Sequence, residues 1–176
     1  MNRKGFTLIE VLAVIIVLSI ILVIAAPSIS NIYKNSKLKS EQVFINRLST
    51  VIDSYVKLNT DKIGFTKVRE ANKKQENYEY SVDIYSGKIN DNQITFENII
   101  NDNLLSAENY VNAGNKDYIN PVTNEKGCIT NAQIEVYRDS DFVYCHKVKK
   151  DSLGCLTDEY KDSIIGEYVI DTCIWE

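Results

Sequence analysis

The chain has 176 residues, 44% of them hydrophobic, so it is long enough for one compact core or for a membrane segment followed by one modest domain. Its 20 basic residues against 24 acidic residues give a formal net charge of -4. This mild acidity provides no strongly basic face, so the composition supports no nucleic-acid site.

The apolar residues are concentrated in one segment near the N-terminus. Residues 6–26, FTLIEVLAVIIVLSIILVIAA, contain a single charged residue, Glu10. A helix of this length rises about 1.5 Å per residue and spans roughly 30 Å, which matches the hydrocarbon core of a bilayer. The segment therefore predicts a transmembrane helix.

A cleavable secretory signal is the main alternative for this segment, with Arg3 and Lys4 as its charged region and a cleavage site near Ala25 and Ala26. The apolar run is longer than the roughly 7–15 apolar residues of such a signal. Glu10 would also be unusual there, because an acid within the membrane costs a few kcal/mol and by default marks a functional site.

The helical pattern continues beyond Pro27. Apolar residues recur at three- and four-residue steps, including Ile45, Leu48 and Ile52, which predicts an amphipathic helix over residues 27–58. Proline removes one helical hydrogen bond, so we expect a kink at this point. A discarded signal peptide would need no such continuation.

Residues 4–10, Lys-Gly-Phe-Thr-Leu-Ile-Glu, together with the apolar run and Pro27, resemble the N-terminus of type IV pilins and type II secretion pseudopilins. The resemblance covers roughly residues 3–35. It implies that a prepilin peptidase cleaves between Gly5 and Phe6, removing residues 1–5 as a leader, and then methylates the new amine of Phe6. Glu10 would set the assembly register by pairing with the amine of a neighbouring subunit.

The resemblance also implies a location and partners. The precursor would be a single-pass membrane protein with its N-terminus in the cytoplasm, and the assembled form would be a filament at or beyond the cell surface. Other pilin subunits would be direct partners, with an assembly ATPase and platform proteins acting indirectly, and no cofactor is implied. Loss of Arg3 and Lys4 with the leader leaves 18 basic against 24 acidic residues, a net charge of -6.

The remaining residues, 59–176, predict a globular head. Alternating apolar residues predict strands at 78–85, 132–138, 142–148 and 167–174, and helical spacing predicts a short helix from Phe96 with Thr95 as its cap. We expect an exposed polar neck at 34–42, a connecting loop at 59–77 and a solvated turn at 139–141. The fold class is therefore α+β, a long N-terminal helix packed against a small antiparallel sheet.

Four cysteines lie in the last third of the chain, and an even number in an exported domain predicts two disulfides, with free thiols as the alternative in a cell without a dedicated oxidation system. We favour Cys128 with Cys145 and Cys155 with Cys173, because each pair closes a short loop. Pairing of Cys145 with Cys173 across adjacent strands remains the rival. None of the four has the paired spacing of a zinc site, so no metal is expected.

The sequence contains no recognisable catalytic set. His146 follows Cys145, but neighbours on a strand point to opposite faces and could not act as a nucleophile pair. The leading hypothesis is thus a non-enzymatic pilin-like subunit of a filament serving adhesion, motility, DNA uptake or secretion. The alternatives are a membrane-anchored ligand-binding protein that does not polymerise and a secreted enzyme behind an ordinary signal.

Overall fold

A computed structural model of the chain describes residues 7–75, 78–101, 111–112, 117–118, 122–123, 129 and 132–175. The chain divides into two compact units, Met1–Lys39 and Ser40–Glu176, each described here by itself. Within the described residues the elements are one long helix, an antiparallel sheet and short helices, so the predicted α+β class is confirmed.

The first unit consists of the N-terminal part of helix α1, which extends over Leu8–Leu58. The helical backbone continues through residues 25–28, and the axis bends by 41° between the segments Leu8–Ile24 and Ile29–Leu58. This stretch includes Pro27, whose missing N–H group predicts a bend.

The second unit begins with the C-terminal part of α1, which buries one apolar face. Its buried apolar residues recur at three- and four-residue steps and are Phe44, Ile45, Leu48, Ile52, Tyr55 and Val56. The predicted exposed neck is wrong at its C-terminal end, because Glu41 is fully buried whereas Val43 is 56% exposed. The buried face of the helix therefore begins with the acid Glu41, and its first buried apolar residue is Phe44.

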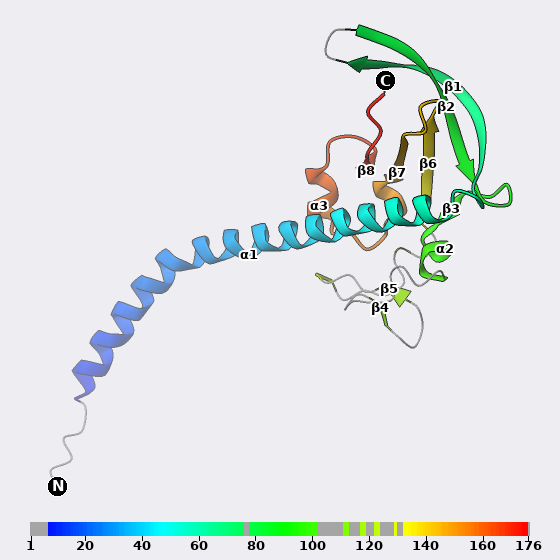
Figure 1. Cartoon of the computed structure of the whole chain (residues 1–176). Helices are drawn as coiled ribbons and strands as arrows, with labels where there is room; N and C mark the ends of the chain where they lie inside the picture. Colours follow the sequence, from blue (N-terminus) through cyan, green and yellow to red (C-terminus); the bar gives the residue numbers. More distant parts are fainter. Residues whose placement is uncertain are drawn as a thin grey trace. The chain divides into compact units, whose positions relative to one another are not determined.

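The sheet has the strand order β1-β2-β6-β7-β8, and all of its pairings are antiparallel. The short strand β3 also pairs with β6, next to the part of β6 that pairs with β2. The strands are β1 (Gly64–Gln75), β2 (Tyr78–Lys88), β3 (Ile94–Thr95), β6 (Gln133–Asp139), β7 (Tyr144–Lys149) and β8 (Tyr168–Asp171). Figure 1 shows β6, β7 and β8 standing against the end of α1, with the long β1–β2 hairpin at one edge.

The two faces of the sheet are covered by different parts of the chain. Val136 pairs with His146, and residues that pair directly share a face. His146 is hydrogen-bonded to Ser49 of α1, so this is the inner face, next to the helix. On the outer face, Cys145 and Ile84 pack in a buried cluster with Trp175 of the C-terminal tail.

Strand β1 corrects the sequence analysis, which expected a connecting loop over residues 59–77. Residues Lys67 to Gln75 pair with β2 except at one bulge, although Ala71 is the only buried residue described within 67–74. β1 lies at the edge of the sheet, where lysines and other polar residues discourage pairing with further strands. Its polar sequence shows no apolar alternation, although pairing with β2 stabilises it as a strand.

The predicted strands of the head are confirmed, with shifted ends. β2 extends to Lys88, and the hairpin turn between β6 and β7 includes Phe142 and Val143. β8 ends at Asp171 rather than at residue 174; Thr172 still bonds to His146 of β7, and Trp175 of the following tail lies on the outer face. Two short strands outside the main sheet, β4 (Val111–Asn112) and β5 (Asp117–Tyr118), pair with each other.

Three short helices complete the described part: α2 (Phe96–Asn101), the 3-10 helix η1 (Lys150–Ser152) and α3 (Asp158–Ser163). α2 begins where predicted, and the Asn98 side chain accepts hydrogen bonds from the backbone N–H and hydroxyl of Thr95. α3 is capped by Thr157, whose hydroxyl accepts from the Tyr160 N–H. Both helices thus begin at a residue with capping chemistry.

Candidate functional site

The first turn of α1 contains a capping box formed by Thr7 and Glu10. The backbone N–H and the hydroxyl of Thr7 each donate to Oε2 of Glu10 at 2.8 Å, and the Glu10 N–H lies 3.4 Å from the Thr7 hydroxyl oxygen. This reciprocal arrangement satisfies groups that a helix N-terminus otherwise leaves unpaired. The sequence analysis missed it, although a threonine three residues before a glutamate is its usual signature.

The helix surface behind this turn is apolar on every side. Fourteen large apolar side chains between Leu8 and Ile24 are exposed, the least exposed at 49%. The hydroxyl of Ser19 donates to the carbonyl of Ile15 at 2.8 Å, so this polar group is satisfied within the helix. Glu10 is consequently the one charged residue on this surface.

The length and hydropathy expected of a bilayer span are not reached by any single helix among the described residues. Leu8–Ile24 and Ile29–Leu58 reach them together, across the bend in α1. The prediction of a membrane-spanning segment at residues 6–26 thus agrees with the composition of the first half of this pair.

The predicted processing site itself cannot be compared with the structure, because Gly5 and Phe6 lie outside the described residues. Cleavage between them, and methylation of Phe6, remain predictions. Glu10 is described, and its Oε1 atom has no hydrogen bond with any described residue, since both capping bonds use Oε2. One carboxylate oxygen on the apolar surface thus remains available to a partner from another molecule.

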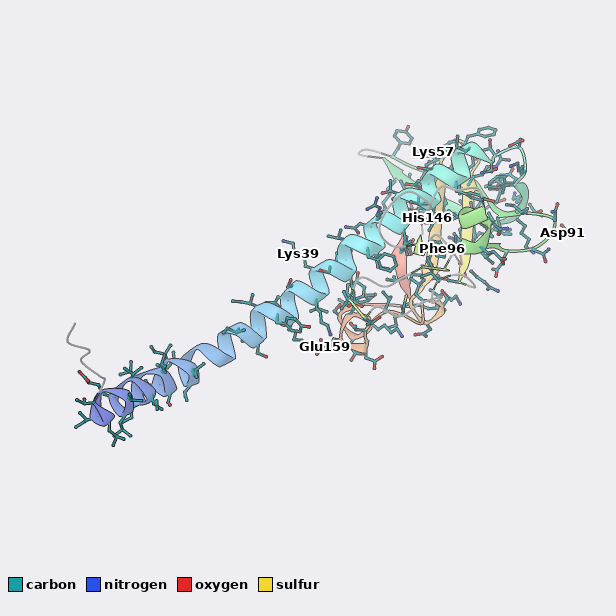
Figure 2. All side chains as sticks on the ribbon, turned by 90° about the horizontal axis from the view of Figure 1, so that it is seen from below. Lys39, Lys57, Asp91, Phe96, His146 and Glu159 are labelled. Atoms are coloured by element: carbon teal, nitrogen blue, oxygen red, sulfur yellow. A yellow bond between two sulfur atoms is a disulfide. The ribbon has the colours of Figure 1, made fainter. Side chains whose placement is uncertain are left out.

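A second polar cluster lies in the head, where His146 connects β7 to α1 (Figure 2). The ring is 1% exposed; Nε2 lies 2.9 Å from the Ser49 hydroxyl oxygen and Nδ1 lies 3.1 Å from Oδ1 of Asp53. Burial lowers the pKa of His146, while Asp53 and Asp171 oppose this shift. Ser49 and Asp53 are four residues apart and lie on the same face of the helix, so each can contact one nitrogen of the ring.

The order serine, histidine, aspartate resembles a hydrolase triad, but the surroundings indicate a structural role. The His146 ring is 1% exposed and both of its nitrogens already have partners in Ser49 and Asp53, and the cavities at Tyr137 and at Asn72 are lined by other side chains. Cys145 points to the outer face, away from the ring, as the alternation along a strand predicts. The cluster joins the helix to the sheet.

The favoured disulfide pairing is wrong. Cys145 on β7 is bonded to Cys173 in the tail, with the two Cα atoms 5.1 Å apart, which is the rival pairing. Cys155 is also disulfide-bonded, and Cys128 lies outside the described residues. Short loops favoured the other pairing, but the sheet places Cys145 on the outer face, where the tail passes.

The predicted solvated turn is wrong at Asp139, which is fully buried. Its Oδ2 lies 2.5 Å from Nζ of Lys73, and its Oδ1 accepts from the Val143 N–H at 2.9 Å. Asp141 is 3.3 Å from the same lysine. Among the described residues, no three His, Cys, Asp or Glu side chains lie close enough together to hold a metal ion.

Comparison with known proteins bears on the N-terminal segment. Residues 1–26 match the family described as "Prokaryotic N-terminal methylation motif". The chain carries a prepilin-type N-terminus. The resemblance to type IV pilins and pseudopilins, drawn from residues 4–10, is thereby confirmed for this segment.

A second comparison matches more residues than the methylation motif contains. The chain is 40% identical over 55 residues to the "ComG operon protein 3 homolog" of Bacillus licheniformis. The match covers 31% of this chain and 57% of that relative, so the chain spans little more than half of the relative's length. No solved structure is significantly similar to the chain, and the function of the head must be argued from its own residues.

Proposed function

We propose that the chain is a pilin-like structural subunit, which a prepilin peptidase cleaves between Gly5 and Phe6 and methylates at Phe6. The subunit then polymerises, with copies of itself or with related pilins, into a type IV pilus or a pseudopilus. The matched methylation motif and the similarity to the ComG operon protein 3 homolog support this proposal.

The observation that carries the proposal is the exposed apolar surface of α1 between Leu8 and Ile24. Burying one such side chain contributes about 1.5–3 kcal/mol, so the fourteen together represent on the order of 20–40 kcal/mol. Water cannot be the working environment of that surface. Lipid covers it in the membrane precursor, and equivalent helices cover it in the filament.

Glu10 gives the proposed filament its register. A carboxylate within an apolar helix bundle needs a partner, and cleavage would create a cationic amine at Phe6. The capping box keeps Oε2 on Thr7, which leaves Oε1 for the amine of a neighbouring subunit. The pair can therefore form between subunits without opening the first turn of either helix.

Mass spectrometry of the mature N-terminus tests processing. We expect an N-methylated Phe6. An intact Met1 would instead support the alternative, a membrane-anchored binding protein that does not polymerise. A chain starting near Pro27 or Ser28 would identify an ordinary secretory signal and refute the proposal.

Substitution of Glu10 tests assembly separately from processing. We expect Glu10→Ala to insert into the membrane as the wild type does but to be lost from purified filaments. Ser19→Ala is the matched control, because the Ser19 hydroxyl is a polar group on the same surface that is already satisfied by Ile15. Normal filament yield from Glu10→Ala would show that Glu10 sets no register.

A further inference from the structure

The outer face of the sheet holds a cavity that neither the assembly helix nor the disulfides explain. Its volume is about 180 Å³, and its lining residues are Val68, Arg69, Ile84, Tyr137, Lys147, Tyr168 and Trp175. Three of these are aromatic, two are basic and two are aliphatic. Such a mixture of ring surfaces with a few polar groups is typical of small-molecule sites.

The acidic groups near the cavity are already engaged. Asp171 accepts a hydrogen bond from Lys147 at 2.9 Å, which compensates that charge. Glu135 accepts from the hydroxyls of Tyr137 and Tyr168 at 3.0 and 3.4 Å through the same oxygen, Oε2. Burial, reinforced by Glu135, raises the pKa of Tyr137 to about 12, so this phenol remains a donor to the carboxylate at neutral pH.

Arg69 is the basic group that remains available to a ligand. It lies on β1 opposite Ile84, and no hydrogen bond or ion pair links its guanidinium to another described residue. A guanidinium presents its donors in a planar fork that matches a carboxylate. The cavity therefore offers an anion site beside aromatic walls.

The cavity can enclose about one ring of a ligand. Since a water molecule occupies about 30 Å³ in the liquid, the cavity corresponds to roughly six waters. This is below the roughly 300 Å³ or more of sites for drug-sized molecules. A single six-membered ring with its substituents is the appropriate scale.

The C-terminal tail forms one wall of the cavity, and a disulfide holds the tail in place. Cys173 is bonded to Cys145 on β7, and Trp175, two residues further on, is 6% exposed and packs on Val82 and Ile84. Figure 1 shows the tail passing from β8 towards the β1–β2 hairpin. The tryptophan wall thus depends on this covalent attachment.

We propose that this cavity binds an anionic monosaccharide of the hexuronate class, with its carboxylate on Arg69 and its ring against Tyr137 and the accessible parts of Tyr168 and Trp175. Lys147 lies 4.9 Å from the centre of the Tyr168 ring, so the sugar does not stack on the face that this ammonium covers. The C–H faces of a pyranose are apolar and pack on aromatic rings, whereas its hydroxyls can donate to the remaining lone pairs of Glu135. A sugar acid uses both properties of the cavity. The inference concerns the head alone and does not depend on the proposed assembly.

Intrinsic fluorescence tests the proposal directly, because Trp175 is the single tryptophan of the chain. The full chain, oxidised and in detergent micelles, is titrated at pH 7 and constant ionic strength with sodium D-glucuronate, D-glucose or sodium acetate. We expect a saturable change in emission with glucuronate only, with a dissociation constant on the order of 1 mM for so small a ligand.

Substitutions identify the groups responsible. Loss of a charge-assisted hydrogen bond in Arg69→Gln should weaken glucuronate binding roughly tenfold. Lys88→Gln, an equal change of charge on an exposed residue of β2 outside the cavity, should leave binding unchanged. The double variant Cys145→Ser, Cys173→Ser should shift the Trp175 emission to longer wavelength and abolish the titration.

Three results would overturn the proposal. An equal response to glucose would show that the carboxylate is not recognised. An equal response to acetate would show that the ring is not recognised. Unchanged affinity in Arg69→Gln, with the fold intact, would remove Arg69 from the site.

Discussion

Glu41 provides the sharpest test of the packing in the head. Its carboxylate is fully buried and accepts two hydrogen bonds from Thr157: Oε1 from the backbone N–H at 2.8 Å and Oε2 from the hydroxyl at 2.6 Å. Thr157 caps α3, so Glu41 attaches that helix to α1. A hydrogen bond to a charged group contributes about 1.5–3 kcal/mol, so losing both in Glu41→Ala should destabilise this attachment by about 3–6 kcal/mol.

Hydrogen exchange measures this attachment locally. The N–H groups of Tyr160 and Lys161 both donate to the Thr157 carbonyl at 3.0 Å, so they report the opening of α3. Because 1.4 kcal/mol corresponds to a factor of ten, exchange of these amides should accelerate at least roughly 100-fold in Glu41→Ala.

Two further variants separate the mechanism from general damage. Glu41→Gln should lose less, because an amide can accept from the Thr157 N–H and donate to its hydroxyl oxygen. Lys39→Ala, an exposed position two residues earlier, should exchange like the wild type. Acceleration below tenfold in Glu41→Ala, or equal acceleration in Glu41→Gln and Glu41→Ala, would refute the reasoning.

Three more predictions follow from the head. Because burial lowers the pKa of His146, the unfolded chain binds a proton more readily, so the free energy of unfolding should decrease as pH falls below about 6.5; His146→Gln should flatten this dependence in denaturant titrations. Phe142 has a φ of 61°, so relief of backbone strain should make Phe142→Gly about 1 kcal/mol more stable than Phe142→Ala, the reverse of the usual loop order. Both variants lose the ring that lies 4.6 Å from the Arg138 guanidinium, so this contact does not affect the comparison. Thermal unfolding that ranks alanine first would contradict the prediction. Asp139→Leu should cost about 1–3 kcal/mol, because Lys73, whose side chain is 11% exposed, keeps only Asp141 as a partner and the Val143 N–H loses its acceptor. Adding Lys73→Met should recover the part of this loss that comes from the lysine in the same unfolding assay.

The elements that the sequence predicted are those whose pattern is local. The helical period from Leu8 to Leu58 and the alternation in β2, β6 and β7 reflect which face of each element is buried. β1 was missed because Ala71 is the only buried residue described between 67 and 74. An edge strand of this kind is stabilised by its partner's backbone, which its own side chains do not reveal.

The buried polar contacts also escaped prediction. Glu41 and Ser49 lie on the helix face that carries the apolar core, although only Glu41 falls in the neck that was expected to be exposed. Their partners, Thr157 and His146, are about a hundred residues away in the chain. No spacing rule connects such pairs, because the fold alone brings them together.

The sequence by itself determined the character of the N-terminal segment, namely its prepilin-type motif and its long apolar run. The methylation motif that residues 1–26 match and the apolar length that a bilayer requires both depend on consecutive residues rather than on the fold. The tertiary structure alone decided which cysteine meets which, that Trp175 covers the outer face, and that Arg69 lies beside aromatic rings. Those facts depend on strand register and on the face to which each side chain points, and a shift of one residue would reverse every one of them.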